Sequence, residues 1–447
     1  MGLGEELLAG VDERGASFEI FRDSIDPAWI TAALEATGTA TIRRRKLPAE
    51  YVVWLVIGMG LLHDRAITEV VRHLDLVLPT PGGGRGTVSG GAIAQARTRL
   101  GPEPLAALFQ QTAGTWATQA ADDDRWHGLA VYGVDGTTLR VADTPENLTA
   151  FDRPGSRHGE GGGYPQLRLV ALMVPRSHLL AGIAMGSYRT SELTLAAALW
   201  PLLPADSITL VDRGFATYSL FQQLHDPATN RHWLTRQKKG LTVRHVATLG
   251  PGDALVDLVP SRATRALHPD LPARIRVRAV RYHRPGFRPQ TLLTSLLDPV
   301  TYPAAELAAL YHERWELELG FDEVKTHTLD RNEALRSTIP ARVRQEVWGL
   351  ALGYNLVRLA IARAAVQAGV PSLRIRYRHA LLLIRGFWAS AWHAAPGVLP
   401  KRITVLHDEL ATLVLPGRRP RRYPRAVKIK MSNYPRKRPR RSRRSAK

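Results

Sequence analysis

Four polar residues late in the chain have the types and spacing to act together on a phosphate and a cation. Tyr311, Arg314, Glu318 and Lys325 are separated by three, four and seven residues. These intervals bring side chains to one face of an α-helix, within an arc of about 60°. A carboxylate beside a phenol and two cations suits joint binding of a metal ion and a phosphate. The alternative is a solvated helix face with an ordinary Arg314–Glu318 ion pair.

Such a helix also needs a face that anchors it to the rest of the protein. An apolar stripe runs beside the polar row, and it consists of Leu310, Leu317, Phe321 and Val324. The stripe predicts that one continuous helix packs against a core and displays the polar row.

Two aspartates upstream share one local setting. Asp135 ends the apolar run 129–134, Asp212 ends the run 207–211, and a glycine turn follows each. Unbroken apolar runs of this length predict buried central strands that deliver the acids to their ends. A lone aspartate at a strand end is more often a turn-former or a helix cap. Two such strands followed by the Glu318 helix are a rarer combination than one aspartate at the end of one strand.

The composition points to a polyanionic partner. The 447 residues include 61 lysines and arginines against 40 acids, a net charge of +21. Nucleic acid is the leading candidate for a partner of such a basic chain. The absence of cysteine excludes disulfides and thiolate metal sites. The most apolar run, 52–62, is shorter than the roughly 20 residues that span a bilayer, so we expect a cytoplasmic protein without a membrane segment.

The spacing Tyr-x2-Arg-x3-Glu-x6-Lys resembles the signature of the insertion-sequence-four family of transposases, and Asp-Arg-Gly-Phe at 212–215 resembles its second motif. The resemblance implies a catalytic triad of Asp135, Asp212 and Glu318. It also implies phosphate contacts from Tyr311, Arg314 and Lys325, and Arg213 could assist them. The implied fold is α/β, a ribonuclease-H-like catalytic core interrupted by a β-rich insertion, with a helical N-terminal DNA-binding domain.

The periodicity divides the chain into five parts. We predict a helical N-terminal domain at 1–125, the first part of the core at 126–235, a β-rich insertion at 236–300, the second part of the core with C-terminal helices at 301–400, and a basic tail at 401–447. The insertion follows from the 106 residues between positions 212 and 318, more than an α/β unit needs.

Several arginines outside the polar row are candidate DNA contacts. Arg97 and Arg99 lie on the predicted helix Ser89–Leu100, and 89–101 resembles the N-terminal segment of the family, where recognition of element ends is thought to lie. Arg274, Arg276 and Arg278 alternate with apolar residues, so one strand face is cationic. The alternatives, a plain helical bundle and a solvated sheet face, carry about equal weight. Residues 417–447 contain 15 basic and no acidic residues, and we expect a flexible polycation there.

Three carboxylates without cysteine suit hard divalent ions bound through oxygen, Mg²⁺ or in its place Mn²⁺. Two ions about 3.5–4 Å apart would support in-line phosphoryl transfer. The predicted function is therefore cleavage of the DNA ends of a mobile element and their joining to target DNA. Joining two ends at once would require at least a dimer. The alternatives are a metal-dependent structure-specific endonuclease and a non-catalytic DNA-binding protein derived from a transposase. Whether cleavage passes through a DNA hairpin stays open.

Overall fold

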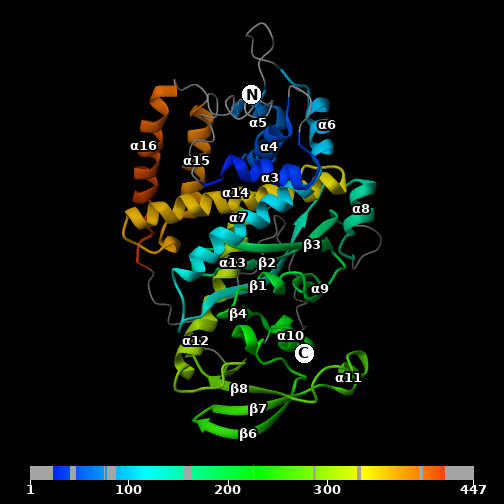
Figure 1. Ribbon diagram of the computed structural model, residues 1–447, viewed down its shortest axis with the longest axis vertical. Helices are drawn as coiled ribbons and strands as arrows, with labels where there is room; N and C mark the ends of the chain where they lie inside the picture. The colour runs from blue at the N-terminus through cyan, green and yellow to red at the C-terminus, as the bar shows by residue number, and fades with distance from the viewer. Residues whose placement is uncertain are drawn as a thin grey trace, which may run out of the picture.

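One mixed sheet of nine strands runs through the computed structural model, with helices at one end and a β-rich region at the other (Figure 1). The structure describes residues 24–40, 47–74, 76–77, 87–155, 163–224, 226–284, 288–329, 334–391 and 396–417. The strands are β1 (Ala130–Arg140), β2 (Gln166–Met173), β3 (Leu180–Ser187), β4 (Ser207–Val211), β5 (Arg231–Arg236), β6 (Thr242–Gly250), β7 (Asp253–Val259), β8 (Ile275–Tyr282) and β9 (Gln290–Thr294). Their order in the sheet is β3-β2-β1-β4-β5-β9-β8-β7-β6.

The centre of the sheet is formed by the two strands that the apolar runs predict. β1 and β4 are parallel neighbours, with Val134 opposite Val211. The residues that follow these two valines, Asp135 and Asp212, therefore lie side by side. Only Asp212 follows the end of its strand, because β1 continues through Asp135 to Arg140, which corrects the prediction of a strand end at Asp135. β5 continues the parallel set beside β4, whereas β2 and β3 are antiparallel to β1 and to each other.

The interval between Asp212 and Glu318 is rich in strands, as predicted. β9 pairs antiparallel with β5, and β8, β7 and β6 follow outward. The insertion thus extends the central sheet and does not form a separate layer. Figure 1 shows β6, β7 and β8 at the end of the molecule remote from the N-terminal helices.

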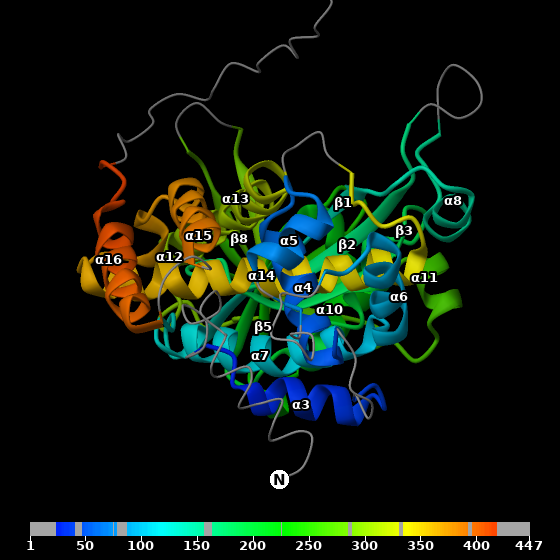
Figure 2. The same ribbon diagram turned by 90° about the horizontal axis from the view of Figure 1, so that it is seen from above.

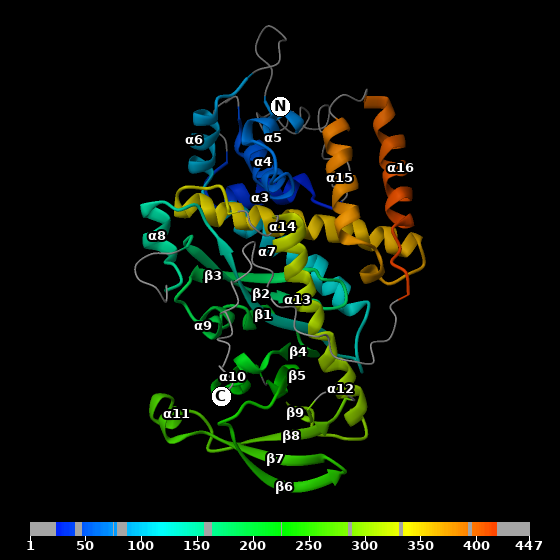
Figure 3. The same cartoon turned by 180° about the vertical axis from the view of Figure 1, so that it is seen from behind.

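Helices flank the sheet and build the opposite end of the molecule (Figure 3). They are α3 (Pro27–Ala36), α4 (Ala49–Leu61), α5 (Ile67–His73), α6 (Gly90–Leu100), α7 (Glu103–Asp122), α8 (Pro145–Phe151), α9 (Glu192–Ala196), α10 (Tyr218–Leu224), α11 (Arg262–Leu267), α12 (Ala304–Glu313), α13 (Trp315–Asp322), α14 (Pro340–Gln367), α15 (Tyr377–Ala391) and α16 (Leu399–Thr412).

The long helix α14 joins the N-terminal helices to the catalytic half of the chain. Figure 2 shows it running across the molecule beneath α4 and α5. The crossing with α4 is close, because a Cβ atom on Gly349 would lie 2.5 Å from the Val56 carbonyl oxygen. α14 is long and apolar enough to cross a membrane, but 78% of its apolar window is buried inside the fold. It is therefore a core helix around which the N-terminal helices pack.

Two boundaries of the predicted organisation need comment. The tail predicted from residue 401 contains the helix α16 over most of its first part, and α16 packs on α14 and α15. Residues 418–447, where most of the tail's charge lies, fall outside the described residues. The predicted helix Ser89–Leu100 is present as α6, and residues 78–86 before it also fall outside the described residues.

Candidate active site

The segment that carries the polar row is broken at Arg314, which corrects the prediction of one continuous helix. α12 ends at Glu313, α13 begins at Trp315, and a π-helical segment, η5 (Glu323–Thr328), follows. α12 contributes Leu310 and Tyr311 to a hydrophobic cluster with β4 and β5, whereas α13 packs into the main core. The backbone at Arg314 stays in the α region, so the break is local, and it falls where the contacts change from one cluster to the other.

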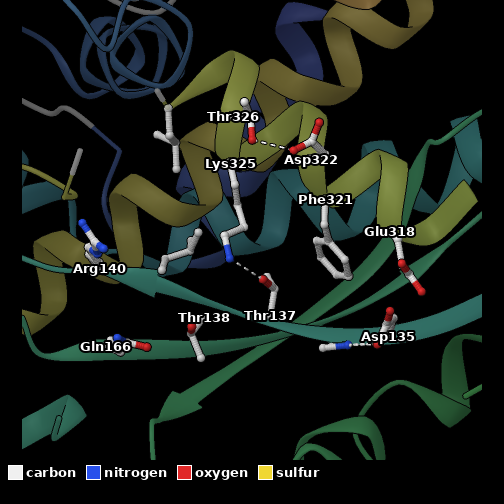
Figure 4. A pocket seen from close by; sticks show the side chains of 13 residues that line it. Asp135, Thr137, Thr138, Arg140, Gln166, Glu318, Phe321, Asp322, Lys325 and Thr326 are labelled. Atoms are coloured by element: carbon white, nitrogen blue, oxygen red, sulfur yellow. Dashed lines mark hydrogen bonds between the residues drawn. The ribbon is translucent and has the colours of Figure 1, made fainter. Parts of the chain in front are cut away.

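A glycine in β1 brings α13 close to the strand. A Cβ atom on Gly133 would lie 2.7 Å from a methyl group of Leu317, so any side chain there would force the Leu317 side chain or α13 to move. Glu318 follows Leu317, and Asp135 lies two residues after Gly133 on the same strand face. The close contact therefore sets Glu318 beside Asp135, as Figure 4 shows.

The guanidinium of Arg314 lies within 4.0 Å of all three predicted carboxylates. Its Nη2 donates to Glu318 Oε1 at 2.8 Å, its Nη1 lies 3.9 Å from Asp135 Oδ2, and its Nε lies 4.0 Å from Asp212 Oδ1. The structure thus brings Asp135, Asp212 and Glu318 together around one positive charge. Residues from two strands and one helix, far apart in the chain, converge at this point.

The two aspartates differ in their readiness to ionise. Burial raises the pKa of Asp135 to about 6, although the Gly136 amide and Arg314 act in the opposite direction. Burial also acts to raise the pKa of Asp212. There it is outweighed by the backbone amides of Arg213 and Gly214 and by two arginine charges, so the pKa is lowered. Asp212 is therefore the better anion of the two in the absence of other cations.

The raised pKa predicts a pH-dependent loss of stability without metal. The pKa of Asp135 is about 6 in the folded chain against an ordinary 3.8, so the folded state holds this proton more tightly. The associated stabilisation is present below about pH 4 and is lost as pH rises through about 6. Asp135→Asn should gain roughly 2 kcal/mol on the wild type between about pH 4 and pH 7. Urea unfolding of both proteins in EDTA measures this gain, and a pH-independent difference would contradict it.

A cleft of about 540 Å³ begins at Asp135 and Glu318 and continues along β1 under α13 and η5 (Figure 4). Lys325 reaches across it, and its Nζ donates to Thr137 Oγ1 at 3.0 Å. The far part of the cleft is lined by Arg140 on β1 and Gln166 on β2. The cleft therefore offers a path for an extended ligand that passes both the carboxylates and Lys325.

Tyr311 is only 5% exposed, so the structure does not place it on an open face beside Lys325. Its hydroxyl misses the geometric criteria for a hydrogen bond within the described part of the chain, but it lies close enough to Arg236 for that guanidinium to act on it as a donor. Burial raises the pKa of Tyr311, whereas the charges of Arg314 and Arg236 act to lower it. The hydroxyl thus lies near two arginines of the carboxylate site. Arg213, in contrast, is exposed beside Asp212.

Two models of known families match the chain. Residues 15–110 match the N-terminal domain of insertion element 4 transposases, and residues 126–356 match the transposase DDE domain. The transposase InsG of insertion sequence element IS4 from Escherichia coli K12 is 34% identical over 437 residues, 97% of both chains. The chain belongs to the insertion-sequence-four family of DDE transposases. It is accordingly a DNA transposase, an enzyme that acts on DNA.

One further relative agrees with this assignment, and one solved structure is too dissimilar to bear on it. InsZ from the same strain is 32% identical over 276 residues, which cover 60% of this transposase and 90% of InsZ. A piggyBac transposase, solved as a synaptic complex with hairpin DNA, aligns over 90% of this chain and 85% of that one. Its 9% identity and TM-score of 0.41 are too low to support any conclusion about this transposase.

The family implies dependence on divalent metal ions, and the carboxylates of this transposase fit that requirement in chemistry. All three offer oxygen, the donor that hard cations prefer. All three also face one point that is already occupied by a positive charge, the Arg314 guanidinium. Within the described ranges no three acidic or histidine side chains are placed to hold an ion together. The carboxylate oxygens are thus the right type of ligand and point toward one place. The side chains must rearrange before they can bind a metal ion together.

Arg97 does not lie on the DNA-reading surface that was predicted for it. It is 2% exposed, and its guanidinium donates to Gln345 Oε1 at 2.8 Å and to Ser337 Oγ at 2.9 Å. The prediction of a direct DNA contact is therefore corrected, because the residue ties α6 to the start of α14. Arg99 is exposed near the end of the same helix and stays a candidate.

The cationic strand face of β8 is also largely neutralised within the sheet. Arg278 is fully buried, and its Nε donates to Asp253 Oδ1 at 2.8 Å, which excludes a DNA contact in this fold. Arg276 pairs with Asp257, directly opposite on β7. Arg274 lies 3.7 Å from the same carboxylate but is largely exposed. Of the three arginines, Arg274 is the one best placed to meet DNA.

Two residues were not singled out from the sequence, one beside a carboxylate and one next to Arg314 in the chain. Arg236 ends β5, and its Nη2 lies 3.5 Å from Asp212 Oδ1. Its position depends on the parallel pairing of β4 with β5, which no local pattern reveals. Trp315 follows Arg314 directly, and its side chain is 56% exposed. An exposed tryptophan within the polar row was a signal that sequence reading could have used.

Proposed function

We propose that Asp135, Asp212 and Glu318 together hold two Mg²⁺ ions, for which Mn²⁺ can substitute, at the catalytic centre of this transposase. The observation that carries the proposal is the position of Arg314, one guanidinium within 4.0 Å of all three carboxylates. Three acids that share one cation are poised to exchange it for others. The strand order β3-β2-β1-β4-β5 supports a ribonuclease-H-like core as the frame of this centre.

When bound, a pair of ions would supply activation of the attacking oxygen and stabilisation of the leaving 3′-oxygen. Arg314 then gives up Glu318 and turns its planar guanidinium to a DNA phosphate, a group that it can bind through two hydrogen bonds. Lys325 binds a neighbouring phosphate from across the cleft. The hydroxyl of Tyr311, which lies near Arg236 and Arg314, donates to a phosphate oxygen beside Asp212.

The DNA strand follows the cleft, and Trp315, exposed at the start of α13, is a candidate base contact near it. An exposed indole can stack on a base, an interaction worth about 1–3 kcal/mol. Arg213 and Arg236 add positive charge around Asp212. Arg99 on α6 and Arg274 beside β8 extend the DNA contacts to both ends of the molecule. We place recognition of the element's ends in the N-terminal helices and chemistry in the sheet.

Cleavage of the element's ends and their joining to a target both use this centre. The joining of two ends requires two protomers, so we propose a dimer on paired ends, acting in the bacterial cytoplasm on the nucleoid. The experiment supplies linear DNA with the cognate ends, a plasmid target and Mg²⁺, and it looks for cleaved ends and joined products. Cleavage without joining would favour a nuclease instead. Calorimetric titration with Mn²⁺ should give two ions for each chain, and none would overturn the metal assignment.

The tail contributes DNA affinity without sequence preference, because residues 417–447 carry 15 positive charges and no negative one. Deletion after Pro416 should flatten the salt dependence of DNA binding. For each phosphate that the shortened chain no longer neutralises, the log–log slope should fall by about 0.9. Fluorescence anisotropy between about 50 and 200 mM salt measures the slope. An unchanged slope would mean that the tail does not engage DNA.

A further inference from the structure

A cluster of buried ionisable side chains lies behind the segment that carries Glu318 and Lys325. It consists of His178, Glu316, Glu323, Tyr354 and Arg358, which we call the His178 cluster. None of these residues belongs to the transposase signature. They come from the turn between β2 and β3, from α13 and η5, and from the core helix α14.

Glu323 is the centre of the cluster. Arg358 Nη2 donates to both of its carboxylate oxygens, at 2.7 and 2.6 Å, and the Tyr354 hydroxyl donates to Oε2 at 2.8 Å. Arg358 and Tyr354 are buried on α14. Burial acts to raise the pKa of Glu323, but the Arg358 charge and the contacts of His178 and Tyr354 outweigh it, so the pKa is lowered and the carboxylate stays ionised. The start of η5 is thus tied to the central helix.

His178 extends this tie to the start of α13. Its backbone is left-handed, with φ of 60°, a conformation that histidine adopts more readily than most residues. Its Nδ1 lies against the Arg358 guanidinium and 3.2 Å from Glu323 Oε2, and its Nε2 lies 3.2 Å from Glu316 Oε2. One imidazole therefore connects Glu316 with Arg358.

Each of the two acids lies shortly before a residue that faces the cleft. Glu316 lies two positions before Glu318, and Glu323 lies two positions before Lys325. η5 is π-helical, a wide turn that is rare and frequent at functional sites. Its last residue, Thr328, hydrogen-bonds Tyr377 at 2.7 Å, which holds the other end of the turn. The segment is thus held at three points on the side away from the cleft.

We propose that the His178 cluster is a positioning device that fixes Glu318 against Asp135 and Lys325 across the cleft. This inference rests on the roles proposed above for Glu318 and Lys325. Stability alone does not explain the cluster, because well-packed apolar residues often stabilise a core at least as much as a buried ion pair does. An ion pair with directed hydrogen bonds fixes one helical register, and placement within a fraction of an ångström governs phosphoryl transfer.

Tyr354→Phe is the decisive variant, because it keeps the ring and removes one hydrogen bond to Glu323. The matched control is Tyr218→Phe, which removes the hydrogen bond of another buried tyrosine, to the Pro272 carbonyl at 2.6 Å. Both should lower the unfolding midpoint by similar amounts. Tyr354→Phe alone should lower the single-turnover cleavage rate at saturating DNA, by about tenfold. DNA affinity should stay within about twofold of the wild type, since no phosphate contact is removed.

Two further measurements separate positioning from plain stability. His178→Gln keeps an amide that can donate to Glu316, so it should retain more cleavage activity than His178→Ala at equal folded fraction. Hydrogen exchange of amides 324–329 should accelerate in Tyr354→Phe and not in Tyr218→Phe. Equal rate losses in the two tyrosine variants, or unchanged exchange, would overturn the proposal. If Lys325→Ala cleaves normally while exchange still accelerates, the proposed role of Lys325 fails and the cluster's hold on η5 stands.

Discussion

Asp135→Asn, Asp212→Asn and Glu318→Gln should each lower end cleavage and strand joining by about 10³-fold or more. Each change keeps the shape of the side chain and removes one of the three negative charges that surround Arg314. Removing one of these charges weakens the hold on the cations that would stabilise the reacting oxygens. All three variants should bind the cognate ends, because the N-terminal helices are untouched. EDTA should abolish wild-type activity.

The control for these variants is Asp206→Asn. Asp206 is an exposed acid that precedes β4, at the opposite end of the strand from Asp212, and asparagine tolerates its left-handed backbone. Gel analysis of cleaved and joined DNA, with each protein at matched folded fraction, measures the effect. Near-normal activity in any one of the three triad variants would remove that carboxylate from the proposed centre.

Among single changes at residues without a proposed functional role, Gly349→Val should cause the largest loss of stability. A Cβ atom at Gly349 would lie 2.5 Å from the Val56 carbonyl oxygen and 2.8 Å from its carbon, backbone atoms that cannot rotate away. α4 and α14 would have to separate, which should lower the free energy of unfolding by about 3 kcal/mol. Because Gly349 carries no chemistry, folded molecules should keep their triad geometry.

Urea unfolding followed by tryptophan fluorescence measures this loss. The control is Gly114→Ala on the exposed side of α7, where a Cβ atom meets nothing within 4 Å. That change should raise stability by about 0.5–1 kcal/mol, because alanine is the better helix former. Equal midpoints for Gly349→Val and the wild type would show that the two helices cross less closely than these distances require.

The strands that carry the two aspartates, and the polar row, were accessible to sequence reading because their signals are local, although β1 continues beyond Asp135 to Arg140. Apolar runs that end in an acid predicted β1 and β4, and helical intervals predicted that Arg314 and Glu318 meet. The break at Arg314 was not predicted, because the spacing of residues on one helix face does not say which part of the core each segment packs against. α12 and α13 pack into different clusters. Long-range packing decided that point.

The same limit explains why the surroundings of Arg97, Arg278 and Arg236 were not predicted. Periodicity assigns a residue to a face of a helix or strand, but it cannot say which face another element covers. Arg97 became buried because α14 packs on α6, and Arg278 because β7 supplies Asp253. Arg236 joined the site because β5 pairs beside β4, with Val211 opposite Thr235. Each of these outcomes depends on contacts between segments far apart in the chain.

The central claim is that one set of three carboxylates serves both cleavage and joining, and pre-cleaved DNA tests it most directly. Ends that already carry a free 3′-hydroxyl bypass the cleavage step, so only joining to the plasmid remains. With such ends, Asp212→Asn should join about 10³-fold more slowly than the wild type while binding them equally well. Joining at the wild-type rate would contradict the claim, because strand transfer would then proceed without Asp212.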